Sequence, residues 1–146
     1  MARQEPHRRD DYTVFQTIST RWMDNDVYGH VNNVVYYSYF DTAVNGYLMA
    51  QGVLDYRQGE TVGLVVETGC QFFSPIAFPD TVTAGIRVTK IGTSSVRYEV
   101  GLFANDSDVA AAQGHFVHVY VGANDHRPAA LPDAFRAALE PLVSNT

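Results

Sequence analysis

The chain has 146 residues, of which 46% are hydrophobic and 18% are charged, and its formal net charge is −6. This composition suits one folded domain, excludes a disordered chain, and leaves no apolar run of the roughly 20 residues that a membrane span requires. The negative charge disfavours nucleic acid as a partner, and the single cysteine, Cys70, suits a reducing compartment, so we expect a cytoplasmic protein. Residues 1–10 are polar and predict a mobile tail, and residues 11–146 predict a single domain.

The first predicted elements are a strand, a polar loop and a long helix. Residues 12–22 alternate partly between apolar and polar and predict the strand, and residues 24–30 predict the loop. Residues 33–49 predict the helix, because this stretch is too long for an ordinary strand and its apolar residues recur at helical spacing. Asn32 suits its N-cap. Since this helix is apolar on nearly all sides, we expect it to be buried.

After Gly52 and a polar turn, the hydrophobic pattern changes to the period of two that marks strands. Four strands are predicted, over residues 62–73, 82–88, 96–102 and 109–121. The run Gly92-Thr93-Ser94 predicts a hairpin turn, and Pro132-Asp133 begin a short C-terminal helix. An antiparallel sheet needs cover on one face, and only the long helix is apolar enough to supply it. We therefore expect an α+β fold in which an antiparallel sheet wraps around one long central helix.

The segment between the first strand and the long helix carries the chemistry. It reads Arg21-Trp22-Met23-Asp24-Asn25-Asp26-Val27-Tyr28-Gly29-His30-Val31-Asn32-Asn33. The free N–H groups of a helix's first turn place a partial charge of about +0.5 at its N-terminus. Asp26 lies in the loop that must pass near this end. A carboxylate beside such donors can hydrolyse a carbonyl compound, because the donors stabilise an oxyanion while the carboxylate activates water or attacks directly.

The run Asp26-x-x-Gly29-His30-Val31-Asn32-Asn33-x-x-Tyr36 resembles the signature of hotdog-fold acyl-CoA thioesterases. The chain is most similar to the 4-hydroxybenzoyl-CoA thioesterase-like family, especially its long-chain acyl-CoA branch, and the resemblance covers most of the sequence. It implies a hotdog fold and the hydrolysis of an acyl-CoA substrate. Asp26 would be the catalytic carboxylate, and the backbone N–H near Asn33 would be the oxyanion donor. It also implies a homodimer or a dimer of dimers, with sheets joined edge to edge and the sites at that interface.

Other residues near the motif have two possible roles each. Tyr28 and Tyr36 are candidates to line the acyl pocket, with packing in the core as the alternative. His30 is a candidate to support the loop or to act as a general base, and Asp24 is expected to be solvated or structural. Glu67 lies within an apolar strand, where a carboxylate is unusual, so it is either a second catalytic group or a partner across a dimer.

One turn departs from the family pattern. Many relatives carry a basic residue there that contacts the phosphates of coenzyme A, whereas the turn at Gly92-Thr93-Ser94 is uncharged. We expect the flanking Lys90 and Arg97, together with the hydroxyls of Thr93 and Ser94, to bind the substrate instead. This departure leaves the acyl carrier open between coenzyme A and acyl carrier protein, and coenzyme A is the favoured of the two.

The sequence carries no signature of a cofactor. His115 and His118 are three apart on a strand and point to opposite faces, so they make a poor metal pair, and we expect neither a metal nor an organic cofactor. Phe72 and Phe73 favour an apolar pocket for a fatty or aryl acyl group. Two other functions stay open: a hotdog protein that binds acyl-CoA without hydrolysis, and a hotdog enoyl-CoA hydratase or dehydratase. The order of the motif favours the thioesterase.

Overall fold

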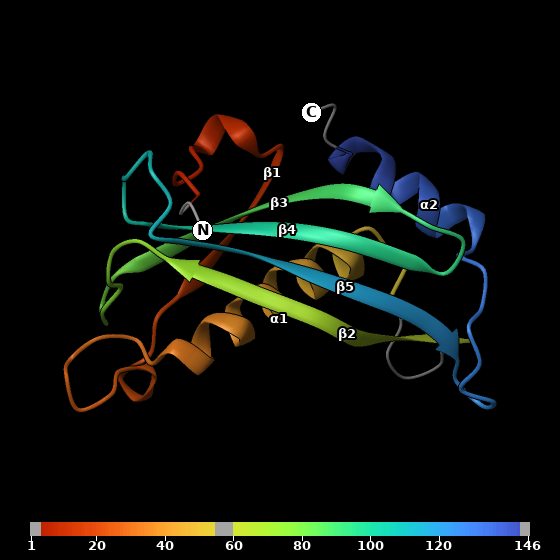
Figure 1. Cartoon of the computed structure of the whole chain (residues 1–146), viewed down its shortest axis with the longest axis horizontal. Helices are drawn as coiled ribbons and strands as arrows, with labels where there is room; N and C mark the ends of the chain where they lie inside the picture. The colour runs from red at the N-terminus through yellow and green to blue at the C-terminus, as the bar shows by residue number, and fades with distance from the viewer. Residues whose placement is uncertain (1–3, 55–59, 144–146) are drawn as a thin grey trace.

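The computed structural model of the protein describes residues 4–54 and 60–143. Its elements are η1 (Arg9–Asp11), β1 (Val14–Ser19), η2 (Trp22–Asp24), α1 (Asn33–Ala50), β2 (Thr61–Phe72), β3 (Thr81–Ile91), β4 (Ser95–Ala104), β5 (Ala112–Gly122), α2 (Asp133–Leu139) and η3 (Glu140–Leu142). The strands of the described residues form one antiparallel sheet in the order β1-β3-β4-β5-β2. α1 crosses one face of this sheet, and α2 lies at the end of the sheet where β3 turns into β4 (Figure 1). No helix in this part of the chain is long and apolar enough to cross a membrane.

The predicted architecture is confirmed, with shifts at some element ends. α1 begins where expected, and the Asn32 side chain caps it by accepting a hydrogen bond from the Val34 N–H at 3.1 Å. The first strand is shorter than predicted because the Arg21 N–H donates to the Asp24 carboxylate and turns the chain into η2. The last strand begins at Ala112 rather than at residue 109. Part of the polar turn predicted after Gly52 falls on residues 55–59, outside the described residues.

α1 packs one of its faces against the sheet. The residues it buries are Tyr36, Tyr39, Phe40, Ala43, Val44, Tyr47 and Leu48. On the sheet, alternate residues of β3 and β4 face the helix and are fully or almost fully buried: Val82, Ala84, Ile86, Val88, Val96, Tyr98, Val100 and Leu102. The opposite side of α1 is open, and Val34 is 65% exposed. The expectation of a helix buried on nearly all sides is therefore wrong for the single chain, because one sheet can cover only one side of a helix.

Gly114 on β5 sets how closely α1 approaches the sheet. A Cβ atom there would lie 2.6 Å from Cε2 of Phe40 and would also clash with the Gly69 carbonyl oxygen. Phe40 is completely buried at this contact. The missing side chain therefore makes room for the ring that anchors α1 on the sheet.

The face of the sheet turned away from α1 is partly covered by the N-terminal segment. The ring of Tyr12 lies over Gly85 and Gly101, where a Cβ atom would be 2.7 Å and 2.6 Å from its atoms. His7 donates its backbone N–H to Gln113 Oε1 at 2.6 Å. The described part of the predicted tail therefore contacts this face, whereas its mobility stays a prediction.

A polar cluster lies inside the core beside α1. His118 is 3% exposed and its Nδ1 is 3.3 Å from the Tyr120 hydroxyl, which in turn pairs with the Tyr98 hydroxyl at 2.8 Å. Among the described residues, His118 Nε2 is buried without a hydrogen-bond partner. Burial lowers the pKa of His118 to about 4, so this imidazole is neutral near pH 7.

We predict opposite effects from alanine at two glycines. Gly114→Ala should lower the free energy of unfolding by roughly 1–3 kcal/mol, because the new methyl group meets backbone and a packed ring. Gly46→Ala, in the middle of α1, should raise it by roughly 0.5–1 kcal/mol, because the Cβ atom would make only ordinary contact with Gln16. Urea denaturation of both variants measures the two changes. Unchanged stability in Gly114→Ala would contradict the close contact.

We also predict that His118 makes the fold sensitive to acid. Folding lowers the pKa of this imidazole from the ordinary 6.5 to about 4. Between these two pH values the imidazole is protonated in the unfolded chain but neutral in the folded chain. As the pH falls below about 6.5, His118 should therefore lower the free energy of unfolding by up to about 1.4 kcal/mol per pH unit. Above pH ~7, His118 should add no pH dependence to that free energy. Urea titrations of the wild type and of His118→Phe from pH ~7 to pH ~4 should diverge; parallel curves would argue against a neutral buried imidazole.

Candidate active site

The loop between η2 and α1 is held closed by its own backbone. The Asp26 N–H donates to the His30 carbonyl at 2.9 Å, and the Gly29 N–H donates to the Asp26 carbonyl at 3.0 Å. Gly29 has φ of +81°, in the left-handed region that favours glycine. The Val31 N–H donates to the Ile76 carbonyl at 2.7 Å, which attaches the loop to the segment after β2. The motif therefore forms an ordered loop at the start of α1.

Asp24 anchors this loop from inside. The residue is 1% exposed, and its carboxylate accepts hydrogen bonds from the Tyr39 hydroxyl at 2.8 Å and from the Arg21 N–H and Nε at 2.9 and 3.0 Å. Burial by itself raises the pKa of this carboxyl, but the bonds from Tyr39 and Arg21 outweigh it and hold the pKa below its ordinary value. The Asn32 N–H donates to the Asp24 carbonyl at 2.9 Å. Asp24 was expected to be either solvated or structural, and the structure shows the structural role. Its hydrogen bonds connect η2, the N-cap residue Asn32 and α1.

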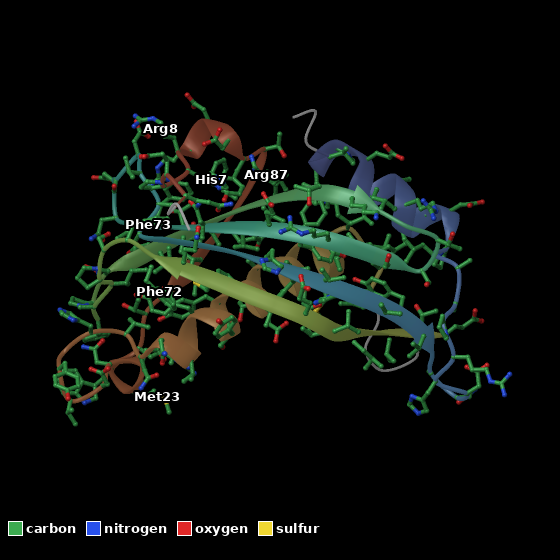
Figure 2. All side chains as sticks on the ribbon, viewed as in Figure 1. His7, Arg8, Met23, Phe72, Phe73 and Arg87 are labelled. Carbon is green, nitrogen blue, oxygen red and sulfur yellow. The ribbon has the colours of Figure 1, made fainter. Side chains whose placement is uncertain are left out.

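A pocket opens where α1 begins and β2 ends. Its volume is about 310 Å³, and we call it the helix-mouth pocket; it is lined by His30, Val31, Asn33, Tyr36, Phe72, Phe73, Ser74 and Pro75. Figure 2 shows Phe72 and Phe73 at this end of β2. The Tyr36 ring meets Phe72 edge to face at 4.9 Å, and the Tyr36 hydroxyl accepts the Ile76 N–H at 3.4 Å. Three residues predicted for the site, His30, Asn33 and Tyr36, thus share one pocket with the two phenylalanines.

Asp26 lies beside this pocket rather than in it. It is half-buried, and its Oδ1 accepts the Tyr28 N–H at 2.8 Å. With Trp22, Asn25, Val27 and Gly29 it lines a second hollow of about 500 Å³, which shares no lining residue with the helix-mouth pocket. Tyr28 is 82% exposed, so it is not a core residue of the single chain. Within one chain, the candidate carboxylate and the helix N-terminus therefore border two neighbouring hollows.

The residues predicted to bind coenzyme A lie elsewhere. The β3–β4 turn that carries Thr93 and Ser94 is at the end of the sheet opposite the start of α1 (Figure 1). Arg97 donates from Nη1 to Glu99 and to Thr89 Oγ1. Lys90 is exposed. In one chain none of these four substrate-binding candidates lines the helix-mouth pocket, so a common site would need a second chain.

Glu67 faces away from α1. A β-bulge lies between Val65 and Glu67, so that Val65 pairs with His118 on the helix side while Glu67 pairs with Val117 on the other face. The Glu67 Oε2 atom is 2.9 Å from Nε2 of His115. The side chain of Glu67 is 65% exposed in this pair. Glu67 therefore does not lie beside the helix N-terminus of its own chain.

The sequence interpretation missed the supports of the loop. The bond between Arg21 and Asp24 was readable in principle from their i, i+3 spacing. The hydrogen bond from Tyr39 to Asp24 and the place of Ser74 and Pro75 in the wall of the helix-mouth pocket could not be read from the sequence. These residues reach the loop only through tertiary folding.

Comparison with known proteins identifies the family. A model of the thioesterase-like superfamily matches residues 20–139, and the chain belongs to this superfamily. The crystal structure of the PA5185 protein of Pseudomonas aeruginosa strain PAO1 is 51% identical, with 97% of this chain and 99% of that chain covered and a TM-score of 0.94. A thioesterase of Thermus thermophilus, crystallised with coenzyme A and zinc, is 33% identical over 91% of this chain and 96% of its own, with a TM-score of 0.73.

A more distant structure supports the fold alone. The 1,4-dihydroxy-2-naphthoyl-CoA thioesterase of Synechocystis is 17% identical, covers 86% of this chain and 93% of its own, and has a TM-score of 0.78. No curated protein sequence matches the chain significantly. The predicted hotdog fold and thioesterase family are thus confirmed, whereas the narrower branch stays a prediction.

We predict that Asp24→Asn destabilises the protein by roughly 2–3 kcal/mol. An amide in this buried position cannot accept the same charge-assisted bonds, and the Arg21 guanidinium loses its counter-charge. Urea denaturation measures the loss. Asp106→Asn, at an exposed position, is the matched control and should change stability by less than about 0.5 kcal/mol. Equal effects of the two variants would contradict the anchoring role.

Proposed function

We propose that the protein hydrolyses acyl-CoA thioesters to a free acid and coenzyme A. The observation that carries this proposal is the helix-mouth pocket, where apolar walls meet the N-terminus of α1 next to the Asp26 loop. Membership of the thioesterase-like superfamily supports it, as does the 33% identical thioesterase that was crystallised with coenzyme A.

In the proposed reaction, the thioester carbonyl oxygen lies against the N–H groups of the first turn of α1, near Asn33. These donors and the helix dipole stabilise the negative charge that develops on that oxygen. Asp26 takes a proton from the attacking water, or attacks the carbonyl carbon to give a mixed anhydride that water then opens. Either way the carbon–sulfur bond breaks, the thiol leaves with a proton, and the acid is released.

The active unit in this proposal is a homodimer joined through β2. This strand is an edge of the sheet, and its residues Leu64, Val65 and Val66 are 46%, 46% and 60% exposed. A long apolar edge strand favours pairing with another chain. Antiparallel pairing would bring the partner's β3–β4 turn to the end of the assembly where this chain's α1 begins. The predicted substrate contacts of Lys90, Thr93, Ser94 and Arg97 would then come from a second chain.

The chemistry of the pocket favours a fatty or aryl acyl group. Tyr36, Phe72 and Phe73 contribute aromatic surface, and an apolar acyl chain gains by leaving water there. The contact between Asp26 and His30 runs through their backbones rather than their side chains, which favours hydrolysis over the hydratase alternative.

We expect Asp26→Ala and Asp26→Asn to lower kcat by roughly 10²-fold or more, because each removes the group that activates water or attacks. The assay is thiol release from a panel of acyl-CoAs of different chain length, with loss of enoyl absorbance followed in parallel on an enoyl-CoA. Asp106→Asn serves as the control and should retain wild-type turnover. Near wild-type turnover in both folded Asp26 variants would rule out the assignment, and loss of enoyl absorbance without thiol release would indicate a hydratase.

A further inference from the structure

The short helix α2 is fastened to the turn between β3 and β4. Arg136 of α2 donates from Nη2 to the Gly92 carbonyl at 2.6 Å and to the Thr93 carbonyl at 3.4 Å. The Leu131 N–H, in the connection that leads into α2, donates to the same Thr93 carbonyl at 3.0 Å. Two consecutive carbonyls of the turn are therefore directed toward α2 and the connection before it.

α2 is itself firmly attached to the domain. Phe135 and Leu139 are buried in the core, and the Phe135 ring meets the ring of Tyr120 edge to face at 4.8 Å. The Tyr47 hydroxyl of α1 donates to the Ala138 carbonyl at 2.7 Å. The Arg136 side chain therefore extends from a fixed support, and its bonds can hold the peptide groups of the turn in one orientation.

The direction of these carbonyls determines where the N–H groups of the turn point. In a planar trans peptide, the C=O of one residue and the N–H of the next point in opposite directions. Because the Gly92 and Thr93 carbonyls accept from Arg136, the N–H groups of Thr93 and Ser94 point away from it. Neither N–H group has an acceptor among the described residues. The turn thus presents two neighbouring donors on the side away from α2.

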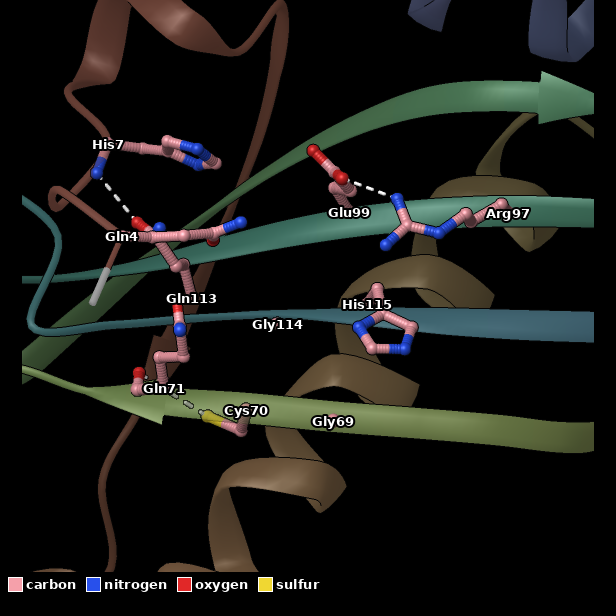
Figure 3. Close-up of a pocket in the computed structure, with 10 residues that line it drawn as sticks. All are labelled: Gln4, His7, Gly69, Cys70, Gln71, Arg97, Glu99, Gln113, Gly114 and His115. Atoms are coloured by element: carbon pink, nitrogen blue, oxygen red, sulfur yellow. Dashed lines mark hydrogen bonds and ion pairs between the residues drawn. The ribbon is translucent and has the colours of Figure 1, made fainter. Parts of the chain in front are cut away.

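Arg136 also places a positive charge behind these donors. The ion pairs of residues 4–54 and 60–143 do not include Arg136, although Asp133 and Glu140 lie three residues before it and four after it. Arg97, which follows the turn in the sequence, differs because its guanidinium pairs with Glu99 on the face of the sheet turned away from α1 (Figure 3). A charged donor on a carbonyl also polarises that peptide group, which makes its N–H a stronger donor.

Neighbouring backbone N–H groups backed by a cation form a site for an anion, and the anionic groups of an acyl-CoA are its phosphates. We propose that the N–H groups of Thr93 and Ser94 bind a phosphate of coenzyme A, and that Arg136 is the positioning residue that orients and polarises them. This inference deepens the proposed function and rests on it. In this arrangement the turn needs no basic residue of its own, because α2 supplies the charge.

Titration calorimetry with coenzyme A, and with pantetheine, which lacks the phosphates, tests the role of Arg136. We expect coenzyme A to bind the wild type more tightly than pantetheine does. Arg136→Gln should weaken coenzyme A binding by roughly 10-fold or more and leave pantetheine binding unchanged. Arg127→Gln removes the same charge at an exposed position and is the matched control, with both affinities unchanged. Equal affinity for coenzyme A in Arg136→Gln and the wild type would overturn the proposal.

A second pair of variants tests the N–H donors and stays informative if Arg136→Gln does not fold. Thr93→Pro and Thr93→Ala both remove the hydroxyl, but only proline removes the N–H group. No hydrogen bond within the described residues is lost with that N–H. We expect Thr93→Pro to weaken coenzyme A binding several-fold more than Thr93→Ala does, and equal losses in the two variants would contradict the site.

Steady-state hydrolysis separates positioning from a general structural effect. Arg136→Gln should raise KM for an acyl-CoA by roughly 10-fold with kcat unchanged, and it should hydrolyse the matching acyl-pantetheine like the wild type. A loss of kcat on both substrates would indicate a structural role and overturn the proposal. Absence of hydrolysis in the wild type would contradict the proposed function instead, whereas calorimetry with coenzyme A involves no reaction and still decides the role of Arg136.

Discussion

The structure depends on one contact, the packing of a single helix face against a single sheet face. Phe40 of α1 fits where Gly114 of β5 has no side chain, and this close approach excludes water from the layer between them. Within residues 4–54 and 60–143, one helix packs along this face of the sheet, so the far side of α1 and the edge of β2 lack cover from these residues. The helix also has to begin at one end of the sheet, and the helix-mouth pocket is formed there.

The loop that leads into α1 is organised by a buried charge. Asp24 is removed from water but compensated by Arg21 and Tyr39, and such a group holds its neighbours in place because losing any partner would leave the charge unpaired. This anchoring fixes the backbone on both sides of Asp26 while leaving the Asp26 side chain half-buried at the surface of the loop. A rigid backbone with an accessible carboxylate suits a group that has to meet a substrate.

The two faces of the sheet give the same residue types different properties. His118 lies in the core with a lowered pKa, whereas His115, three residues earlier, lies on the opposite face beside Glu67. The apolar face binds the helix, and the polar face carries arginines and glutamines. A single strand thus contributes to the core with one side and to the polar outer face with the other.

The sequence by itself determined the local elements and the position of the motif. The length and spacing of the apolar run at residues 33–49, the turn at Gly92-Thr93-Ser94 and the N-cap at Asn32 act over a few residues, so local rules were sufficient for the helix, the hairpin and the loop. Only the tertiary structure decided which face of α1 is buried, that Glu67 faces away from the helix, and that the predicted coenzyme A contacts lie at the other end of the sheet. These outcomes depend on strand register, on the bulge between Val65 and Glu67 and on contacts between distant segments, which no local pattern encodes.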